Sequence, residues 1–371
     1  MLSQDRPKRY GAHSLSKVHL VTEHANEAKL LVGVLTTRHR HKRFSGNHQF
    51  YEGLCKKVRK RGGLLYVFTP EGLQEHSIEG YTFLETNNKW VKQLFPYPNI
   101  VYNRVPTRKE EQMKKTQQIL QHFQQAHIPY FNPHFFNKWD MYQALVQNSK
   151  LAKHLPKTKR FTSPSDLRSM LEVVNSLYVK PINGCQGKGI LRLKQLKTET
   201  FLFEDHHQKQ LLSLLNIIDY FFPSLHQVIL QEAIPLMTLK NRPYDFRVHM
   251  HKTKGRWQQT GIGVRCGKID GITTHVHQGG SILPIEEIEP KPDFEQIKVL
   301  AETICEQLDP TFGPLAECSL DIGRDIDSHY WIFEVNAKPM TFDEPDIQEN
   351  ILTSLTNIFF EWCGIEDANS S

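Results

Sequence analysis

The chain has 371 residues, a length that favours two domains or one composite enzyme fold. A hydrophobic fraction of 39%, a charged fraction of 23%, and 21 glycines with 20 prolines are typical of a globular protein and exclude a fibrous or disordered chain. The net charge of +6 is uneven, because residues 1–60 carry 13 Lys and Arg against 4 Asp and Glu. This basic end could bind a polyanion or simply be solvated, and no interleaved aromatic pattern favours a nucleic-acid partner.

The sequence predicts neither export nor membrane insertion. No apolar run reaches the ~18 residues that a membrane helix needs, and the first residues lack the apolar stretch of a signal peptide. The six cysteines lie far apart without a CxxC pair, which favours reduced thiols over a zinc site or a disulfide framework. We therefore expect a cytoplasmic protein that is not secreted and has no membrane partner.

In chain order, a basic segment over residues 1–29 precedes a predicted small parallel α/β domain over residues 30–132. Three apolar runs are typical of buried strands, namely Leu30–Leu35, Leu64–Phe68 and Asn99–Tyr102. Between the first two runs, Phe50, Leu54 and Val58 recur at helical spacing and predict a basic helix. Strand, helix and strand in this order indicate a βαβ unit, here without the GxGxxG phosphate loop.

A polar helix is expected next, from about Arg108 to His127 with Met113, Leu120 and Phe123 on its apolar side. A second domain is expected over residues 137–365, opening with a helix that runs from Lys138 to about His154. Short strands with few helices between them then predict a mostly antiparallel α+β domain. These strands are expected at 176–181, 189–193, 228–232, 244–252, 257–265, 315–322 and 330–335.

Two β runs around a polar turn at Asp327-Ser328 predict a hairpin with an acidic face. In that register Asp321 faces Glu334, and Ser319 faces Asn336. Alternation places Leu320, Ile322, Phe333 and Val335 on the core side. Two carboxylates about 5 Å apart repel unless a counter-charge lies between them. Mg²⁺ bound by Asp321, Glu334 and Asn336 would supply that charge, and neutralisation by Lys338 and Arg324 on a solvated hairpin is the alternative.

A second segment joins a strand that ends in Lys180, a glycine-rich turn and a returning strand. The glycines let backbone amides close over anionic oxygens, while Lys180 and Lys188 supply positive charge. This turn is neither a Walker A loop nor a kinase glycine loop, because a strand follows it and no HRD or DFG triplet occurs. The alternative is a plain hairpin with a flexible basic tip.

A third polar face combines Asp245, Arg247 and His249 on one strand with Arg265 at the end of the next. Arginines on such a face suit a transferring phosphoryl group or a carboxylate. The paired histidines His249/His251 and His275/His277 could be metal ligands, but the sequence offers no third ligand at a recognisable spacing.

In this order the motifs resemble those of the ATP-grasp superfamily over residues 137–365, with a lid subdomain at about 158–232. Over nearly the whole chain the pattern is similar to the YheC/YheD type of endospore coat-associated proteins. The segments that carry this similarity are Gly33–Thr36, Tyr66–Pro70, Val101–Arg104, Asn137–Trp139, Leu155–Thr158 and Val179–Pro181.

The resemblance implies an ATP-dependent carboxylate–amine ligase that uses Mg²⁺ or Mn²⁺, takes a carboxylate and an amine as substrates, and works in sporulation. The resemblance also implies that the protein is located in the mother-cell cytoplasm or on the spore coat, where coat proteins would be its partners. A non-catalytic ATP-binding coat or scaffold protein is the alternative, favoured by one departure: the ligase branch has an arginine where this chain has Ser319.

Carried over by position, the resemblance implies the following residue roles. Arg247 and Arg265 would steady the transferred phosphoryl group, while Arg104, Arg108 and residues 273–281 are candidates for holding the acceptor. Asp321, Glu334 and Asn336 would bind the metal. Nucleotide binding would fall to Lys138, Lys180, Gly184, Gln186, Gly187, Lys188, Gly189, Gln231, Glu232, Ala233 and Asp245.

Overall fold

The computed structural model describes residues 27–184, 186–269 and 271–365, and these residues form two compact units. One unit comprises the described residues up to Phe131 together with those from Leu355 onward, and the other spans Asn132–Ser354. Most of the basic segment predicted at 1–29, and Cys185, lie outside the described residues. The domain boundaries drawn from the sequence remain a prediction.

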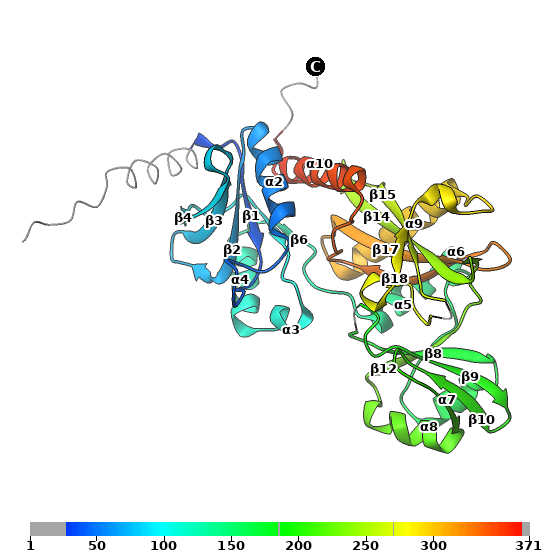
Figure 1. Ribbon diagram of the computed structural model, residues 1–371. Helices are drawn as coiled ribbons and strands as arrows, with labels where there is room; N and C mark the ends of the chain where they lie inside the picture. Colours follow the sequence, from blue (N-terminus) through cyan, green and yellow to red (C-terminus); the bar gives the residue numbers. More distant parts are fainter. Residues whose placement is uncertain (1–26, 185, 270, 366–371) are drawn as a thin grey trace, which may run out of the picture. The chain divides into compact units, whose positions relative to one another are not determined.

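The N-terminal unit is built on a mixed sheet with the strand order β4-β3-β2-β1-β5-β6 (Figure 1). Strands β2, β1, β5 and β6 are parallel, whereas β3 and β4 add antiparallel pairs. The expected parallel strands are therefore present, and the antiparallel hairpin is an addition that the sequence did not predict. The elements are β1 Leu31–Leu35, α2 His48–Lys60, β2 Leu64–Leu73, β3 Ile78–Leu84, β4 Lys89–Phe95, β5 Ile100–Asn103, α3 Arg108–Glu111, α4 Lys114–Gln125 and β6 Tyr130–Phe131.

The helix expected from Arg108 to His127 is two helices, α3 and α4. Met113 does not pack on the apolar side as predicted. It is the N-cap residue of α4 and is 47% exposed, because the chain is extended there between the two helices. Leu120 and Phe123 are buried as predicted, and Ile119 completes the apolar stripe of α4.

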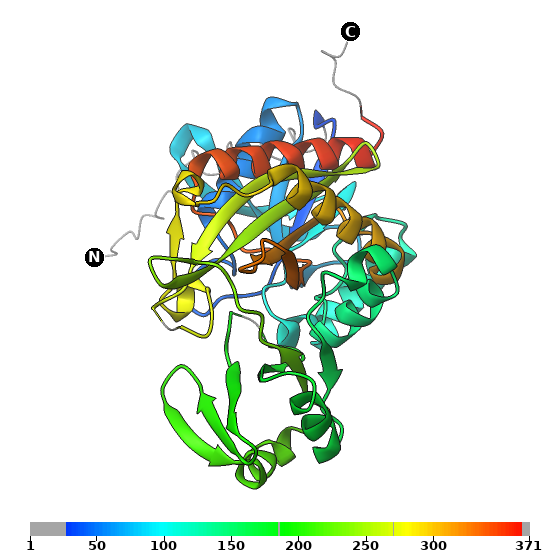
Figure 2. The same cartoon turned by 90° about the vertical axis from the view of Figure 1, so that its right-hand side faces the viewer.

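In the second unit, one antiparallel sheet has the strand order β11-β10-β9-β8-β12-β7. Helices α7 and α8 cover one face of it, and their apolar side chains share a core with Leu177, Val179 and Leu193 of the strands (Figures 1 and 2). We call this part the lid. Its elements are β7 Thr158–Arg160, α7 Pro164–Leu171, β8 Ser176–Pro181, β9 Leu191–Lys197, β10 Thr200–Glu204, β11 Lys209–Ser213, α8 Leu214–Phe221 and β12 Val228–Glu232.

The other sheet of this unit has the order β16-β15-β14-β17-β18, with β13 paired to β14. Helices α5, α6 and α9 bury its apolar face, and we call this part the platform. The helix expected from Lys138 to His154 is interrupted at Gln147–Asn148, where Asn148 caps a new turn. The elements are α5 Lys138–Val146, α6 Ser149–Ala152, β13 Thr238–Leu239, β14 Arg242–Thr253, β15 Arg256–Cys266, β16 Ser281–Leu283, α9 Phe294–Phe312, β17 Glu317–Arg324 and β18 Tyr330–Asn336. Helix α10, Pro345–Trp362, begins in this unit, and its residues from Leu355 onward belong to the N-terminal unit.

The α+β class and the mostly antiparallel pairing of the second domain are confirmed. Within the described residues, no helix combines the length and the apolar character that crossing a membrane requires. The described cysteines are free thiols.

Asn132 fixes the start of the second unit to the platform. Its side chain donates hydrogen bonds to the carbonyl oxygens of Glu317, at 3.0 Å, and Ala337, at 2.6 Å, and accepts one from the backbone N–H of Ala316 at 3.2 Å. The residue is fully buried and has a φ of +56°, a conformation that asparagine tolerates better than most residues.

We expect Asn132→Ala to lower the free energy of unfolding by about 3 kcal/mol, because buried backbone groups lose their partners and alanine is strained at positive φ. Denaturant unfolding measures the loss. Asn241→Ala is the matched control, since Asn241 has a φ of +61° in the same unit but is exposed. Equal losses in the two variants would show that the buried hydrogen bonds contribute nothing.

Candidate functional site

The β17–β18 hairpin has the predicted register, with Asp321 opposite Glu334 and Ser319 opposite Asn336. A β-bulge follows, so that Ile322 pairs with Ile332. The bulge adds one residue to β18 and breaks the two-residue alternation. The prediction that Phe333 faces the core is therefore wrong: Phe333 and Glu334 both line a cavity on the polar side.

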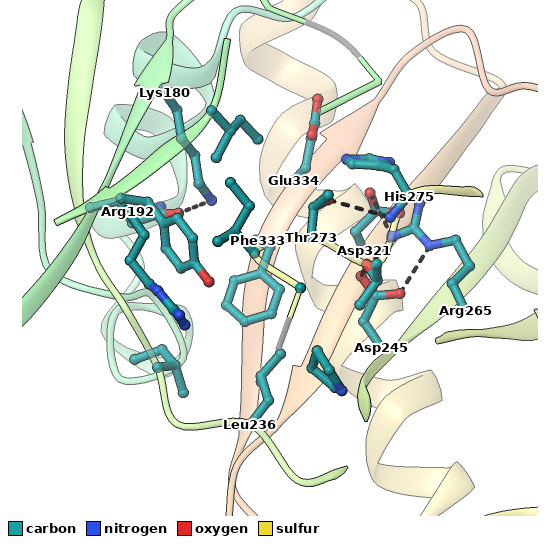
Figure 3. A pocket seen from close by; sticks show the side chains of 18 of the residues that line it. Lys180, Arg192, Leu236, Asp245, Arg265, Thr273, His275, Asp321, Phe333 and Glu334 are labelled. Atoms are coloured by element: carbon teal, nitrogen blue, oxygen red, sulfur yellow. Dashed lines mark hydrogen bonds and ion pairs between the residues drawn. The ribbon is translucent and has the colours of Figure 1, made fainter. Parts of the chain in front are cut away.

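This cavity, of about 290 Å³, lies between the lid and the platform. In Figure 3, Lys180 and Arg192 lie on the lid side, and Asp245, Arg265 and Asp321 lie on the platform. Part of the wall is apolar and is formed by Tyr178, Ile190, Ile234, Pro235, Leu236, Pro243, Ile272 and Phe333. One cavity thus offers an apolar wall and a densely charged region, which suits a ligand with a flat apolar part and an anionic part.

Arg265 is the centre of a buried charge cluster on the platform. It donates two parallel hydrogen bonds to Asp245, at 2.9 and 2.7 Å, and its Nη2 lies 3.0 Å from Asp321 Oδ2. Thr274 adds a hydroxyl donor to Asp245 at 2.6 Å. Burial opposes the charge of Arg265, but the two carboxylates outweigh it and raise the pKa of the guanidinium. Because its donors are engaged, Arg265 acts first as the group that orients these carboxylates.

The carboxylates present a set of atoms that fits a divalent cation. Asp321 Oδ1 is buried and has no hydrogen-bond partner among the described residues. Ligand atoms of Asp321, Glu334 and His275 all lie within 4.8 Å of one another. Burial, with the nearby charge of Arg265, lowers the pKa of His275, so that its ring is neutral at pH 7. Asn336 is not among the residues that line the cavity and lies two pairs further along the hairpin, opposite Ser319.

Two lysines face this acidic set. Lys138, at the start of α5, donates to Glu334 Oε1 at 2.7 Å and to the carbonyl oxygen of Gly184 at 3.1 Å. Lys180, at the end of β8, donates to the Gln231 side chain. Burial in the cavity wall and the charge of Lys138 lower the pKa of Lys180 to about 8, against the opposing effect of Glu334.

The glycine-rich turn lies against the loop at 273–281. Gln278 donates to the carbonyl oxygen of Gln186, and a Cβ at Gly187, whose φ is +72°, would collide with His275. Lys188 is exposed. Of the described residues in this turn, Gly184, Gln186, Gly187, Lys188 and Gly189 are not among those that line the cavity.

The remaining predicted residues lie at the end of β12 and on β14. Gln231 and Glu232 line the cavity at the end of β12, but the N–H of Ala233 already donates to the carbonyl oxygen of Ser176 at 3.0 Å and is not available to a nucleobase. Arg247 is paired in register with Asp321, yet its Nη2 donates to the carbonyl oxygen of Met340 at 2.8 Å, and burial lowers its pKa.

Sequence reasoning missed several wall residues. Arg192 comes from a strand whose pattern carries no sign of a ligand, and Phe333 was assigned to the core by alternation. Thr274 and His275 come from the loop at 273–281, which was predicted to hold the acceptor. The HxH pair that contains His275 was the one signal that could have identified it.

The fold defined by these sheets is that of the ATP-grasp ligases. The structure of the ATP-grasp ligase PsnB complexed with minimal precursor superposes with a TM-score of 0.51 at 16% identity, covering 87% of this chain and 97% of that chain. The VanG D-Ala:D-Ser ligase from Enterococcus faecalis gives a TM-score of 0.51 at 13% identity, covering 90% and 99%.

The chain belongs to the YheC/D-like ATP-grasp family, whose model matches residues 127–362. It is similar to two proteins of Bacillus subtilis (strain 168). The endospore coat-associated protein YheD is 29% identical over 359 residues, which cover 88% of this chain and 77% of YheD. The endospore coat-associated protein YheC is 24% identical over 302 residues, which cover 77% of this chain and 83% of YheC.

We expect Asp245→Asn to destabilise the protein by about 3 kcal/mol, because it takes one charge from a buried ion pair and leaves Arg265 undercompensated. Thermal and denaturant unfolding measure the effect. Thr274→Val removes only a neutral hydrogen bond to the same carboxylate and should cost about 1 kcal/mol. A loss for Asp245→Asn no larger than that for Thr274→Val would contradict the central role of the pair.

Proposed function

We propose that the chain is an ATP- and Mg²⁺-dependent ligase that activates a carboxylate as an acyl phosphate for attack by an amine or similar nucleophile. One observation carries the proposal: a single cavity combines an apolar wall, two inward-facing lysines and a carboxylate set that includes the unpartnered Asp321 Oδ1. The family and the fold support the same class of reaction.

In this proposal the apolar wall holds the adenine and the lysines bind the phosphates. Lys180 and Lys138 both lie in the cavity wall, where low dielectric strengthens their attraction for phosphate oxygens. Asp321 and Glu334 would hold the metal, with Asn336 or His275 as a further ligand. When bound, Mg²⁺ neutralises charge on the β- and γ-phosphates.

The reaction needs no covalent nucleophile from the protein. A carboxylate oxygen of the substrate attacks the γ-phosphorus, the bond to the β-phosphate oxygen breaks, and ADP leaves. The amine nitrogen then attacks the acyl carbon, loses a proton and displaces phosphate. The protein contributes position and charge: Arg265 keeps Asp245 and Asp321 in place, and Arg247, opposite Asp321, is our candidate for the cation that steadies the transferred group.

The names of the relatives support a place for this reaction in spore-coat formation. We propose that the protein acts in the mother-cell cytoplasm or on the spore coat, with coat proteins as partners. A non-catalytic ATP-binding scaffold is the second candidate, since Ser319 stands where the ligase branch has an arginine.

ATP affinity should depend on the charge of Lys180. Because its pKa is about 8 in the free protein, the lysine is charged below pH 8 and must take up a proton to bind the triphosphate above it. We expect affinity to be constant from pH 6.5 to 7.5 and to fall by about tenfold per pH unit above pH 8.5. Lys180→Arg keeps its charge throughout and should flatten this profile in calorimetric titrations. An unchanged profile in that variant would exclude Lys180 as the titrating group.

Glu334→Gln should weaken Mg²⁺-dependent ATP affinity by at least about tenfold and abolish ADP release in the presence of substrates, because the metal loses an anionic ligand. Calorimetry with and without Mg²⁺ measures the first effect. ADP release over pools of amino acids and small peptides measures the second. Asp327→Asn, at the exposed tip of the same hairpin, is the matched control and should behave as wild type.

Equal Mg²⁺-dependent affinity in wild type and Glu334→Gln would remove the metal assignment. Tight ATP binding by the wild type without ADP release over any pool would contradict the ligase and favour the scaffold.

A further inference from the structure

A second polar cluster lies on the platform, outside the cavity described above. His249 and His251 come from β14, and Glu317 is the first residue of β17. The three side chains are buried, with at most 2% of the surface of each residue exposed. Glu317 lies four positions before Asp321 in β17, a distance of about 13 Å along the strand. The cluster is therefore separate from the candidate magnesium ligands although the same strands carry both.

The side chains of this cluster converge on one point. Nε2 of His249 lies 3.3 Å from Glu317 Oε1, and Nε2 of His251 lies 3.8 Å from the same oxygen. The other ring nitrogens converge as well, because Nδ1 of His249 and Nδ1 of His251 lie 3.2 and 2.9 Å from Thr260 Oγ1. The hydroxyl of Thr260 thus orients both rings, and one carboxylate oxygen of Glu317 faces the Nε2 atoms of both.

The protons available to the cluster cannot satisfy every one of these atoms. Thr260 Oγ1 has one proton and two lone pairs, so at least one of the two Nδ1 atoms must donate to it. Nε2 of His251 is buried and has no hydrogen-bond partner among the described residues. If His251 donates through Nδ1, its Nε2 is a lone pair pointing at a carboxylate oxygen. That arrangement is unfavourable unless a cation lies between the two atoms.

The separations match those of a first-row metal site. Metal–nitrogen and metal–oxygen bonds of about 2.0–2.2 Å in a tetrahedral zinc site place neighbouring ligand atoms about 3.3–3.5 Å apart. The two histidine–carboxylate distances, 3.3 and 3.8 Å, need only a small movement of His251 to meet that requirement. A metal-bound histidine usually has its second ring nitrogen fixed by a hydrogen bond, and here the hydroxyl of Thr260 supplies that bond to both rings.

We propose that His249, His251 and Glu317 bind one divalent transition-metal ion, with zinc the best match, and that Thr260 orients the two rings. Imidazole ligands favour such an ion over Mg²⁺, which prefers oxygen. Ser319, opposite His249 in register, has a buried hydroxyl without a partner among the described residues and is placed to approach the open side of the ion.

The ion would join β14 to β17 on the face that also carries Asp245 and Asp321. Since a metal that binds the folded state adds its binding free energy to folding, this site would stabilise the platform without taking part in nucleotide binding.

The test uses the untagged full-length protein, expressed with added Zn²⁺ and freed of loose metal by gel filtration without nucleotide. Elemental analysis should find about one zinc per chain in the wild type and in Glu334→Gln, but a small fraction of that in His251→Gln and Glu317→Gln. Glu334→Gln is the matched control, because it alters the other acidic cluster. Co²⁺ in place of zinc should give visible absorption in the wild type that both ligand variants lose.

A measurement on the wild type alone covers the case in which a ligand variant does not fold. Stripping the metal with a chelator should lower the melting temperature, and one equivalent of Zn²⁺ should restore it. The proposal is overturned if the wild type, expressed with Zn²⁺ and gel-filtered but not treated with chelator, holds no zinc. It is also overturned if Zn²⁺ leaves the melting temperature of the stripped protein unchanged, or if Glu334→Gln loses zinc as the ligand variants do.

Discussion

The candidate site depends on one buried arginine. Arg265 comes from β15 and grips Asp245 of β14 with two hydrogen bonds while also contacting Asp321 of β17, so it ties three adjacent strands through charge. Two carboxylates in a low-dielectric wall would repel each other. The positive charge of Arg265 offsets this repulsion, and its hydrogen bonds hold both carboxylates in place. The other oxygen of Asp321 is buried and has no hydrogen-bond partner among the described residues. The chemistry proposed for the cavity therefore begins with a structural ion pair.

Alternation and turn chemistry were enough to predict part of this fold. The strands at 176–181 and 228–232 have the predicted bounds, and the polar turn at Asp327-Ser328 set the register that pairs Asp321 with Glu334. The bulge after Asp321 was not predictable, because it depends on how Phe333 fits against the cavity and not on any local preference. The strands β3 and β4 were missed because no strong turn pair separates them from their neighbours.

The residues of the candidate site were also predicted only in part. Lys180 and Lys138 were predicted from their places in motifs at a strand end and a helix start, and both line the cavity. The place of His275 was not found, since a loop has no periodicity from which to read the direction of a side chain. The sequence likewise offered no third ligand near the HxH pair of β14. Glu317, which we propose as that ligand, is 66 residues away along the chain but is paired with His251 across the sheet.

The bulge in β18 also limits how the chain can change in length. The segment between Asp321 and Glu334 contains a turn and one extra strand residue, Phe333. Deleting Phe333 would remove the bulge and restore plain alternation while Glu334 stays opposite Asp321. Adding a residue at the same place would instead shift Glu334 by one position and turn it toward the apolar layer. The strand portion of this hairpin therefore tolerates a deletion at the bulge better than an insertion, and its solvent-facing tip is the place where length can vary in both directions.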